Sequence, residues 1–434
     1  YKLSGQHIKI VKDKIGKILS YSVRNSIWKN SRHYYKKRMG TITLINGIRN
    51  IQYNSDAGSR NLIYFSRQGA HYTNNANQSG TIDISKYFGN LVDKDISSIA
   101  VFKNGSLKFA FDGITLLEGR QNYSLKSRFY DKMLKKRGIY IQTHVAMQKK
   151  RLERLIKILK KCGYNMVTID LKDDFGMVNY ESKLDIVKKV RANFGTTINL
   201  KQFLKTMHGN GIHVVARMVI FKDPVLFEYE NGKYAAWDYV NQKSWIGNIY
   251  SRRAGGNINM KERWLDPHSE FVWKYNIAIA KELQEYGVDE IQFDYIRFPT
   301  DGQNIHNLTF RYNKLKQERA DAVENFLLLA RKELSIPISA DIYGVSGWYH
   351  VGDRIGQDVD MLSQYVDAIC PMFYPSHFED SFLNHTPFEE RPYRIYYYGS
   401  HRSMIMSNLR VDIRCYLQAF RLKSRPYDVK YYGI

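Results

Sequence analysis

Residues 286–299 read Tyr286-Gly-Val-Asp-Glu-Ile-Gln-Phe-Asp-Tyr-Ile-Arg-Phe-Pro299. This pattern predicts the end of a helix, a turn at Gly287 and a short apolar strand, Ile291–Phe293, with Asp294 at its C-terminal end. Parallel α/β barrels carry their active residues at the C-terminal ends of the strands, so Asp294 is a candidate for chemistry. Asp294 could instead cap a loop or pair with Arg297, and this stretch alone leaves that alternative open.

From Gly138 onward, strand-like and helix-like segments alternate, which predicts repeated β/α units with right-handed crossovers. No G-x-G-x-x-G motif of the dinucleotide-binding type opens the first β/α unit, and polar residues end nearly every strand. We therefore favour a barrel over a doubly wound sheet. The expected strands are Ile139–Ala146, Met166–Leu171, Ile212–Phe221, Ile291–Phe293, Ile338–Ile342, Ala368–Phe373 and Val411–Phe420. The expected helices are Lys149–Lys161, Leu200–His208, Ser269–Tyr286, one within Tyr312–Leu334, and a short one around Val359–Tyr365.

Only Arg421–Ile434 follow the seventh expected strand, too few residues for a helix and a strand. The sequence therefore predicts an α/β fold, a (β/α)8-type TIM barrel that lacks its last strand in this chain. Before residue 138 the pattern is short and β-like, with an Asn104-Gly105 hairpin turn between Ile99–Lys103 and Ser106–Phe111. We expect a basic N-terminal arm (1–39), a small antiparallel β domain (40–119), a linker (120–137) and the barrel (138–434).

Charge is unevenly distributed over the 434 residues, whose net charge is +24. Residues 1–138 hold 25 Lys and Arg against 8 Asp and Glu, and the remainder holds 41 against 34. A basic arm of this kind could bind an anionic envelope polymer or lipid, or could be a solvated basic face without a partner. Nucleic acid is disfavoured, because no helix-turn-helix, zinc-finger or aromatic RNA-binding signature accompanies the charge.

Three cysteines, Cys162, Cys370 and Cys415, are far apart and lie in apolar contexts, so we expect buried free thiols rather than a disulfide framework. No apolar run approaches the length needed to cross a bilayer. The chain opens at Tyr1 rather than Met, so we expect that an N-terminal segment precedes it, and the lack of a signal peptide carries no information.

Carboxylates and aromatic side chains follow successive strand ends, and this combination suits a sugar site: two acids transfer protons or attack, and rings stack on the sugar. No His-x-x-x-His or Glu-x-x-His pair and no G-x-S-x-G motif occurs, so we expect no metal, no cofactor and no serine nucleophile. The catalytic candidates are Asp294 and Asp341, and the candidate substrate-binding residues are Asp170, Asp173, Arg217, Trp264, Asp266, Tyr295, Arg297, Tyr343, Tyr374, His377 and Gln418.

At these residues the chain resembles a bacterial family known as the putative glycosyl hydrolase domain, a TIM barrel of the α-amylase-like glycosidase superfamily. The resemblance covers about residues 138–420. Two features depart from the family pattern. The stretch Ile413–Phe420 lacks the expected Pro-Trp-like pair, and no apolar aromatic strand closes the barrel before Ile434. The matching segments are Thr168–Asp174, Ala216–Pro224, Trp264–Pro267, Glu290–Pro299, Ser339–Gly344 and Pro371–His377. The resemblance implies glycosidase-like activity without naming a substrate.

The leading hypothesis is a glycoside hydrolase that acts on a cell-envelope or extracellular polysaccharide, with the protein secreted or in the cell envelope. Asp294 would be nucleophile or base and Asp341 the general acid, while Asp170 and Asp173 would bind sugar hydroxyls or tune the pair electrostatically. Crowded carboxylates repel one another, which raises the pKa of a proton donor. The alternative is a non-catalytic carbohydrate- or wall-binding surface protein that retains the barrel.

Overall fold

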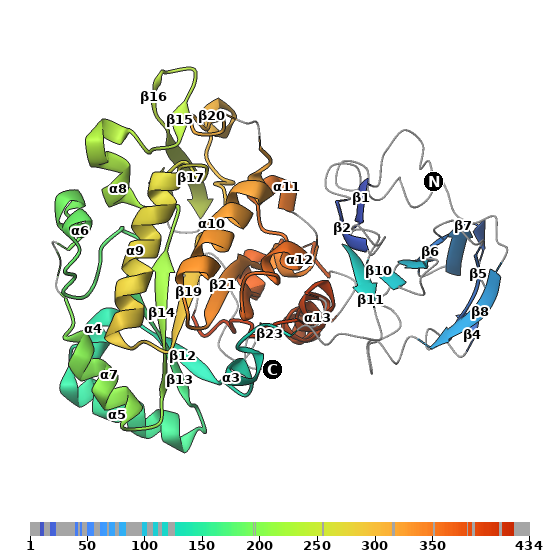
Figure 1. Ribbon diagram of the computed structural model, residues 1–434, viewed down its shortest axis with the longest axis horizontal. Helices are drawn as coiled ribbons and strands as arrows, with labels where there is room; N and C mark the ends of the chain where they lie inside the picture. The colour runs from blue at the N-terminus through green and yellow to red at the C-terminus, as the bar shows by residue number, and fades with distance from the viewer. Residues whose placement is uncertain are drawn as a thin grey trace.

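The computed structural model describes individual strands before residue 120 and then residues 126–420, apart from residues 194, 196, 254–255, 315–316, 350–351, 380, 384–386 and 408–409 (Figure 1). The strand pairs that it describes before residue 120 are all antiparallel. These strands are β1 (Lys9–Lys12), β2 (Ile18–Ser22), β3 (Gly40–Thr41), β4 (Leu44–Ile45), β5 (Asn50–Ser55), β6 (Asn61–Ser66), β7 (Gly69–Thr73), β8 (Gln78–Asp83), β9 (Ser98–Val101), β10 (Leu107–Phe111) and β11 (Thr115–Gly119).

The strands that flank Asn104-Gly105, β9 and β10, pair antiparallel with Leu107 opposite Val101. The turn itself lies outside the described residues, and so does the basic arm apart from its strands. The domain boundaries at residues 39, 119 and 137 stay predictions. Within the predicted linker, Met133 of the short helix α3 (Tyr130–Met133) is buried, and the backbone N–H of Ser127 donates to the carbonyl of Arg410 at 2.8 Å.

Seven parallel strands form the central sheet, in the order in which they occur along the chain. This order means that each connection advances by one strand, as in the wall of a barrel. The interior strands are buried on both faces, which is typical of a sheet covered by crossover helices. The strands are β12 (Gly138–Ile141), β13 (Met166–Lys172), β14 (His213–Val219), β19 (Glu290–Asp294), β21 (Ile338–Tyr343), β22 (Ala368–Met372) and β23 (Asp412–Ile413).

The sheet is curled into a half-barrel. Arg414, just after β23, donates from Nη1 to Sδ of Met166 at 3.0 Å and from Nη2 to Oε1 of Glu290 at 2.5 Å. Tyr416 donates to Oε1 of Gln292, on β19, at 2.6 Å. The last segment therefore faces β13 and β19 across the interior. Among residues 126–420 as described, no eighth parallel strand joins the sheet, and residues 421–434 lie outside the described part.

Helices cover the outside of the sheet, as Figure 1 shows for α9 and α10. The predicted helix Lys149–Lys161 forms with these bounds and buries Leu152, Ile156 and Leu159 on one face. The helices are α4 (Thr143–Ala146), α5 (Lys149–Lys161), α6 (Asp185–Val190), α7 (Leu200–His208), α8 (Pro224–Glu228), α9 (Glu270–Tyr286), α10 (Arg319–Glu333), α11 (Gly352–Ile355), α12 (Val359–Leu362) and α13 (Arg391–Met406), with 3-10 turns η2 (Tyr229–Gly232), η3 (Ile305–Asn307), η4 (Gly344–Gly347), η5 (Pro375–His377) and η6 (Phe388–Glu390). None of the helices in the described residues is long and apolar enough to cross a membrane.

Several expected boundaries were wrong. The strand predicted over Ile139–Ala146 ends at Ile141 and gives way to α4, and the strand predicted over Val411–Phe420 shrinks to β23 plus one bridge at Tyr416. Cys162, predicted to be buried, is exposed; Cys370 is buried, Cys415 is half-buried, and all three thiols are free. The insertion between β14 and α9 holds the hairpin of β17 (Ile246–Arg253) and β18 (Gly256–Arg263). In addition, β15 (Trp237–Asp238) pairs with β16 (Lys243–Ser244) and β20 (Leu308–Thr309).

Candidate active site

The central sheet brings charged side chains together at the C-terminal ends of its strands. Asp170 on β13 lies opposite Arg217 on β14 in the parallel register. Asp294 is the last residue of β19, and Asp341 lies near the end of the adjacent strand β21. Adjacent parallel strands lie about 4.8 Å apart, so these side chains reach one another.

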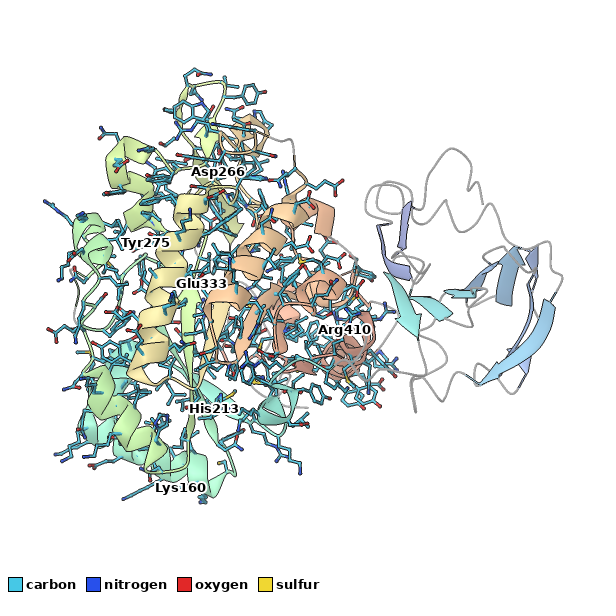
Figure 2. The ribbon with its side chains drawn as sticks, viewed as in Figure 1. Lys160, His213, Asp266, Tyr275, Glu333 and Arg410 are labelled. Atoms are coloured by element: carbon cyan, nitrogen blue, oxygen red, sulfur yellow. The ribbon has the colours of Figure 1, made fainter. Side chains whose placement is uncertain are left out.

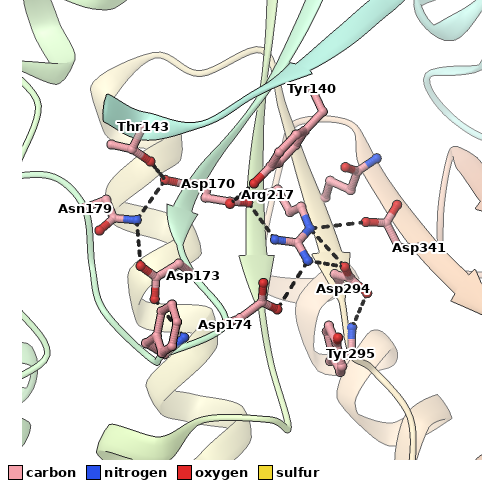
Figure 3. A network of polar contacts seen from close by, with 12 residues as sticks. Tyr140, Thr143, Asp170, Asp173, Asp174, Asn179, Arg217, Asp294, Tyr295 and Asp341 are labelled. Carbon is pink, nitrogen blue, oxygen red and sulfur yellow. Dashed lines mark hydrogen bonds and ion pairs between the residues drawn. The ribbon is translucent and has the colours of Figure 1, made fainter. Parts of the chain in front are cut away.

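Arg217 lies at the centre of the group (Figure 3). Its Nη1 donates to Oδ1 of Asp170 at 2.6 Å, its Nε donates to Oδ2 of Asp294 at 2.9 Å, and its Nη2 donates to the same Asp294 oxygen. Ion-pair contacts reach Oδ1 of Asp174 at 3.5 Å and Oδ2 of Asp341 at 3.7 Å. Burial opposes the guanidinium charge, but the four carboxylates, Asp294 first, outweigh it and raise the pKa of Arg217 well above its ordinary value.

Asp294 is held in a fixed orientation. Its Oδ1 accepts the backbone N–H of Tyr295 at 2.6 Å, while its Oδ2 accepts both Arg217 bonds. Tyr295 has a φ of 52°, a left-handed conformation that is uncommon outside glycine. The strained turn therefore directs the N–H of Tyr295 back at the carboxylate, and Asp294 as a whole residue is 5% exposed.

Asp341 has a different environment from Asp294. It is 1% exposed, and neither carboxyl oxygen has a hydrogen-bond partner in the described residues. Burial, followed by the charge of Asp294, raises the pKa of Asp341 well above its ordinary value, although Arg217 opposes the shift. From the sequence we expect Asp294 and Asp341 to project from adjacent strands into a solvated cleft. The strands β19 and β21 are adjacent, but both residues are buried rather than solvated.

The two consecutive acids after β13 diverge. Asp173 turns away from Arg217 and accepts the backbone N–H groups of Phe175 at 2.9 Å and Met177 at 3.0 Å, and so stabilises its own loop. Asp174 faces Arg217, and its side chain is 44% exposed. Burial, with help from the charges of Asp294 and Asp170 and against that of Arg217, raises the pKa of Asp174. Of the two, Asp174 belongs to the site.

The part of the chain that holds the central sheet matches a known family. Residues 138–433 match the family described as "putative glycosyl hydrolase domain". The chain belongs to this family. No curated protein matches the chain.

Solved structures similar to this family member include a hypothetical protein from Ruminiclostridium thermocellum ATCC 27405, with 36% identity over 47% of this chain and 96% of that chain (TM-score 0.39). The PgaB (BpsB) glycoside hydrolase domain from Bordetella bronchiseptica is 11% identical, and the match covers 65% of this chain and 93% of that chain (TM-score 0.41). A noncanonic maltogenic α-amylase, AmyB, from Thermotoga neapolitana is 15% identical, and the match covers 62% of this chain and 56% of that chain (TM-score 0.36).

Aromatic side chains border the acids of this glycosyl hydrolase domain. Tyr140 on β12 donates to Oδ2 of Asp170, and its ring lies 6.0 Å from the guanidinium carbon of Arg217. Burial, followed by the charges of Asp341 and Asp294, raises the pKa of Tyr374. Burial, followed by the charge of Asp341, raises the pKa of Tyr416, whose hydroxyl donates to Gln292 on β19. Tyr140, Asp174 and Tyr416 are not among the predicted site residues. Of the three, Asp174 carried a sequence signal, because it follows Asp173 at the end of the second expected strand.

Arg297 packs against three aromatic rings near the acids. The guanidinium carbon of Arg297 lies over three predicted site residues, at 4.9 Å from the ring of Trp264, 5.3 Å from Tyr295 and 5.7 Å from Tyr343. Trp264 is fully buried, so its ring supports Arg297 and is closed to a sugar, whereas Tyr343 is exposed. The alternative that Asp294 pairs with Arg297 is not seen, since Asp294 pairs with Arg217.

Two further predicted site residues, Asp266 and Gln418, stabilise loops, as Asp173 does. Asp266, in the loop before α9 (Figure 2), is fully buried and accepts the backbone N–H groups of His268 at 2.9 Å and Tyr312 at 2.8 Å. Gln418 accepts from the N–H and the hydroxyl of Ser376 at 3.2 and 3.0 Å. His377 is exposed, with its ring 5.3 Å from that of Tyr374.

No group of three or more His, Cys, Asp or Glu side chains is arranged to hold a metal ion in the part of the chain that the structure describes. The four aspartates of the site instead share one guanidinium, Arg217. Chemically, the arrangement offers an oriented carboxylate, a second carboxyl with a raised pKa and partial exposure, and aromatic walls. These are the groups that glycoside hydrolysis uses.

Proposed function

We propose that this chain is a glycoside hydrolase that cleaves a cell-envelope or extracellular polysaccharide in a (β/α)8-type barrel. The observation that carries the proposal is the sharing of Arg217 by four carboxylates from the C-terminal ends of β13, β19 and β21 and the loop after β13. A single buried cation fixes the orientation of several acids, and glycoside hydrolysis needs two acids in different protonation states.

Asp294 serves as the nucleophile or base in this proposal. Three hydrogen bonds, two from Arg217 and one from the N–H of Tyr295, orient its carboxylate. Hydrogen bonds that hold a reacting group in place reduce the cost of reaching the transition state. Asp294 is only 5% exposed, so its carboxylate has little contact with bulk water.

Asp174 serves as the general acid. A proton donor must reach the glycosidic oxygen and keep its proton near neutral pH. Asp174 combines a partly exposed side chain with a raised pKa, whereas Asp341, the acid assigned from the sequence, has a side chain with no exposed surface. Asp341 acts on its neighbours electrostatically from beneath the site.

The spacing of the acids favours retention of configuration. Asp174 and Asp294 both contact Nη2 of Arg217, so their carboxyl groups are close together. Retaining enzymes hold the two carboxyl groups about 5–5.5 Å apart, whereas inverting enzymes need about 6.5–9.5 Å to admit a water. The proposed first product therefore keeps the anomeric configuration of the substrate.

A second candidate function is carbohydrate binding without hydrolysis. The observation in its favour is that Asp294 and Asp341 are nearly inaccessible and that Arg217 pairs with all four acids, as in a structural ion network. In that case Arg297, Tyr295 and Tyr343 would bind the sugar, and the acids would hold the strands together through their ion pairs with Arg217.

One screen separates the two functions. Purified envelope and extracellular polysaccharides are incubated with the wild-type protein and with Asp294→Asn, and mass spectrometry records any released oligosaccharides. The proposal expects products from at least one polysaccharide with the wild type and none with the variant. Binding of a polysaccharide by both proteins, with no product from either, would favour the second candidate.

A further inference from the structure

A pocket lies at the opposite end of the central sheet from the carboxylates. Its walls come from residues that precede strands: 126–128 before β12, 363–367 before β22 and Arg410 before β23, together with Arg331 of α10. The volume is about 350 Å³, which is within the range of small-ligand sites. The carboxylates of the proposed active site follow the strands, so the two sites are separate.

Four cations and one carboxylate line this pocket: Lys126, Arg128, Arg331 and Arg410 against Asp367. Asp367 is fully engaged, because its Oδ1 accepts the N–H of Phe129 at 3.2 Å, and its Oδ2 accepts from Nη2 of Arg331 at 2.6 Å and from the N–H of Ile338 at 2.9 Å. Nη1 of Arg410 also lies 3.9 Å from Oδ1 of Asp360. These two carboxylates do not balance four cations, so the pocket carries a net positive charge.

Two of the arginines lie close enough to repel each other. The guanidinium carbons of Arg128 and Arg331 lie 5.0 and 5.9 Å from the centre of the same Phe129 ring. Burial lowers the pKa of Arg331, Asp367 opposes this shift, and the charge of Arg128 adds to it. Arg331 already donates to the carbonyls of Tyr365 and Ile336 and to Asp367. An anion in the pocket would reduce the repulsion and accept charge-assisted hydrogen bonds from the N–H groups that remain.

An unsatisfied hydroxyl lies in the same wall. Oγ of Ser127 is buried and has no hydrogen-bond partner in the described residues. A buried polar group without a partner costs free energy, so native proteins rarely leave one unless a ligand or water satisfies it. Ser127 stands between Lys126 and Arg128 in the chain, which places a neutral donor among the cations.

We propose that this pocket binds the phosphate group of a small molecule. Arginine forks match phosphate oxygens, and several guanidinium groups suit a doubly charged oxyanion better than a single carboxylate. The ligand is either free inorganic phosphate or a phosphorylated sugar. The inference does not depend on the proposed hydrolysis, because it concerns other residues at the other end of the sheet.

The test measures, on the full chain, the melting temperature and, by calorimetry, the binding affinity. The ligands are inorganic phosphate, glucose 6-phosphate, sodium acetate and sodium chloride, all at the same ionic strength. Phosphate is expected to bind and to raise the melting temperature, and acetate and chloride are not. Tighter binding of glucose 6-phosphate than of inorganic phosphate would assign a sugar phosphate, and the reverse would assign free phosphate.

Variants locate the binding. Arg128→Gln and Arg410→Gln are expected to weaken phosphate binding about tenfold each, and Arg151→Gln, a control at an exposed position on α5, is expected to leave it unchanged. Melting temperatures without phosphate check that each variant folds. No phosphate binding, equal binding by all variants, or an equal effect of chloride would overturn the proposal.

Discussion

Arg217 orients the acids around it. Its guanidinium donates short hydrogen bonds to Asp170 and Asp294, whereas it lies 3.7 Å from Oδ2 of Asp341 without a hydrogen bond to it. The pKa of Asp341 and that of Asp174 are raised, mainly by burial. A raised pKa is what a proton donor in glycoside hydrolysis needs.

The state of Asp341 has a consequence for stability. In the folded protein its pKa is raised by burial and then by the charge of Asp294. The protonated carboxyl therefore contributes its full stability below the pKa of the unfolded chain, about 3.9. This contribution is lost as the pH rises through the pKa of the folded protein. At pH 7 the buried carboxyl costs stability. Asp341→Asn should therefore raise the free energy of unfolding at pH 7 by about 1–3 kcal/mol and change it little at pH 3.5.

Denaturant unfolding at the two pH values measures this effect, with Asp289→Asn as an acid-to-amide control on a half-buried carboxylate near the start of β19. Equal or lower stability of Asp341→Asn at pH 7 would mean that the carboxyl is ionised and needed by Arg217.

At the scale of elements, the loop after β13 positions Asp174. Gly176 has a φ of +81°, and a Cβ there would meet Oδ1 of Asp223 at 2.1 Å. Asp223 forms a fully buried salt bridge of 2.7 Å with Lys172, the last residue of β13. Gly176→Ala should therefore displace the loop, cost about 1–3 kcal/mol of stability and lower hydrolysis by moving Asp174.

Gly163→Ala is the matched control, because Gly163 also has a positive φ, +69°, but nothing lies within 4 Å of its added Cβ. Melting temperature and hydrolysis rate are measured for both. If the two variants lose stability equally and both keep full activity, the contact with Asp223 does not position the loop.

The order of the strands and the acids at their ends followed from the sequence, because apolar runs of four to eight residues separated by helical patterns are a strong local signal. Burial did not follow, since the exposure of Asp341 and the divergence of Asp173 from Asp174 depend on contacts between distant segments. Helix α13 was missed because its tyrosines and Gly399 have low helix propensity. Gly399 is explained by packing: a Cβ there would lie 2.6 Å from Nε1 of Trp348.

At the scale of the whole molecule, a buried ion cluster ties the last strand to the middle of the sheet. Oε1 of Glu290 accepts from Arg414 at 2.5 Å and from the hydroxyl of Ser339, and Oε2 lies 3.1 Å from Nε2 of His213. Burial opposes the charge of Glu290, but Arg414 and His213 outweigh it and lower its pKa from 4.5 to about 2.

Glu290 thus contributes stability that is present above pH 4.5 and is lost as the pH falls towards 2. Glu290→Gln should lower the free energy of unfolding at pH 7 by about 3 kcal/mol, because Arg414 loses its buried partner, and the difference from wild type should vanish near pH 2. Thermal unfolding from pH 7 to pH 2 measures it. A difference that stays constant over this range would show that the lost charge is not its cause.

We propose that the carboxylates around Arg217 hydrolyse a glycosidic bond. Comparing the hydrolysis rates of variants at Asp294 and at Asp173 tests this proposal. Asp294 contacts Arg217, whereas Asp173, near the same end of the sheet, accepts hydrogen bonds from its own loop, which an asparagine oxygen can also accept. The measurement is the rate of reducing-end release, with wild type, Asp294→Asn and Asp173→Asn, from the polysaccharide that the wild type cleaves. We expect a loss of at least about 10³-fold for Asp294→Asn while that variant stays folded at the assay temperature, and a rate within about tenfold of wild type for Asp173→Asn. Equal rates for the two variants, or a loss in Asp294→Asn that only follows unfolding, would contradict the proposal.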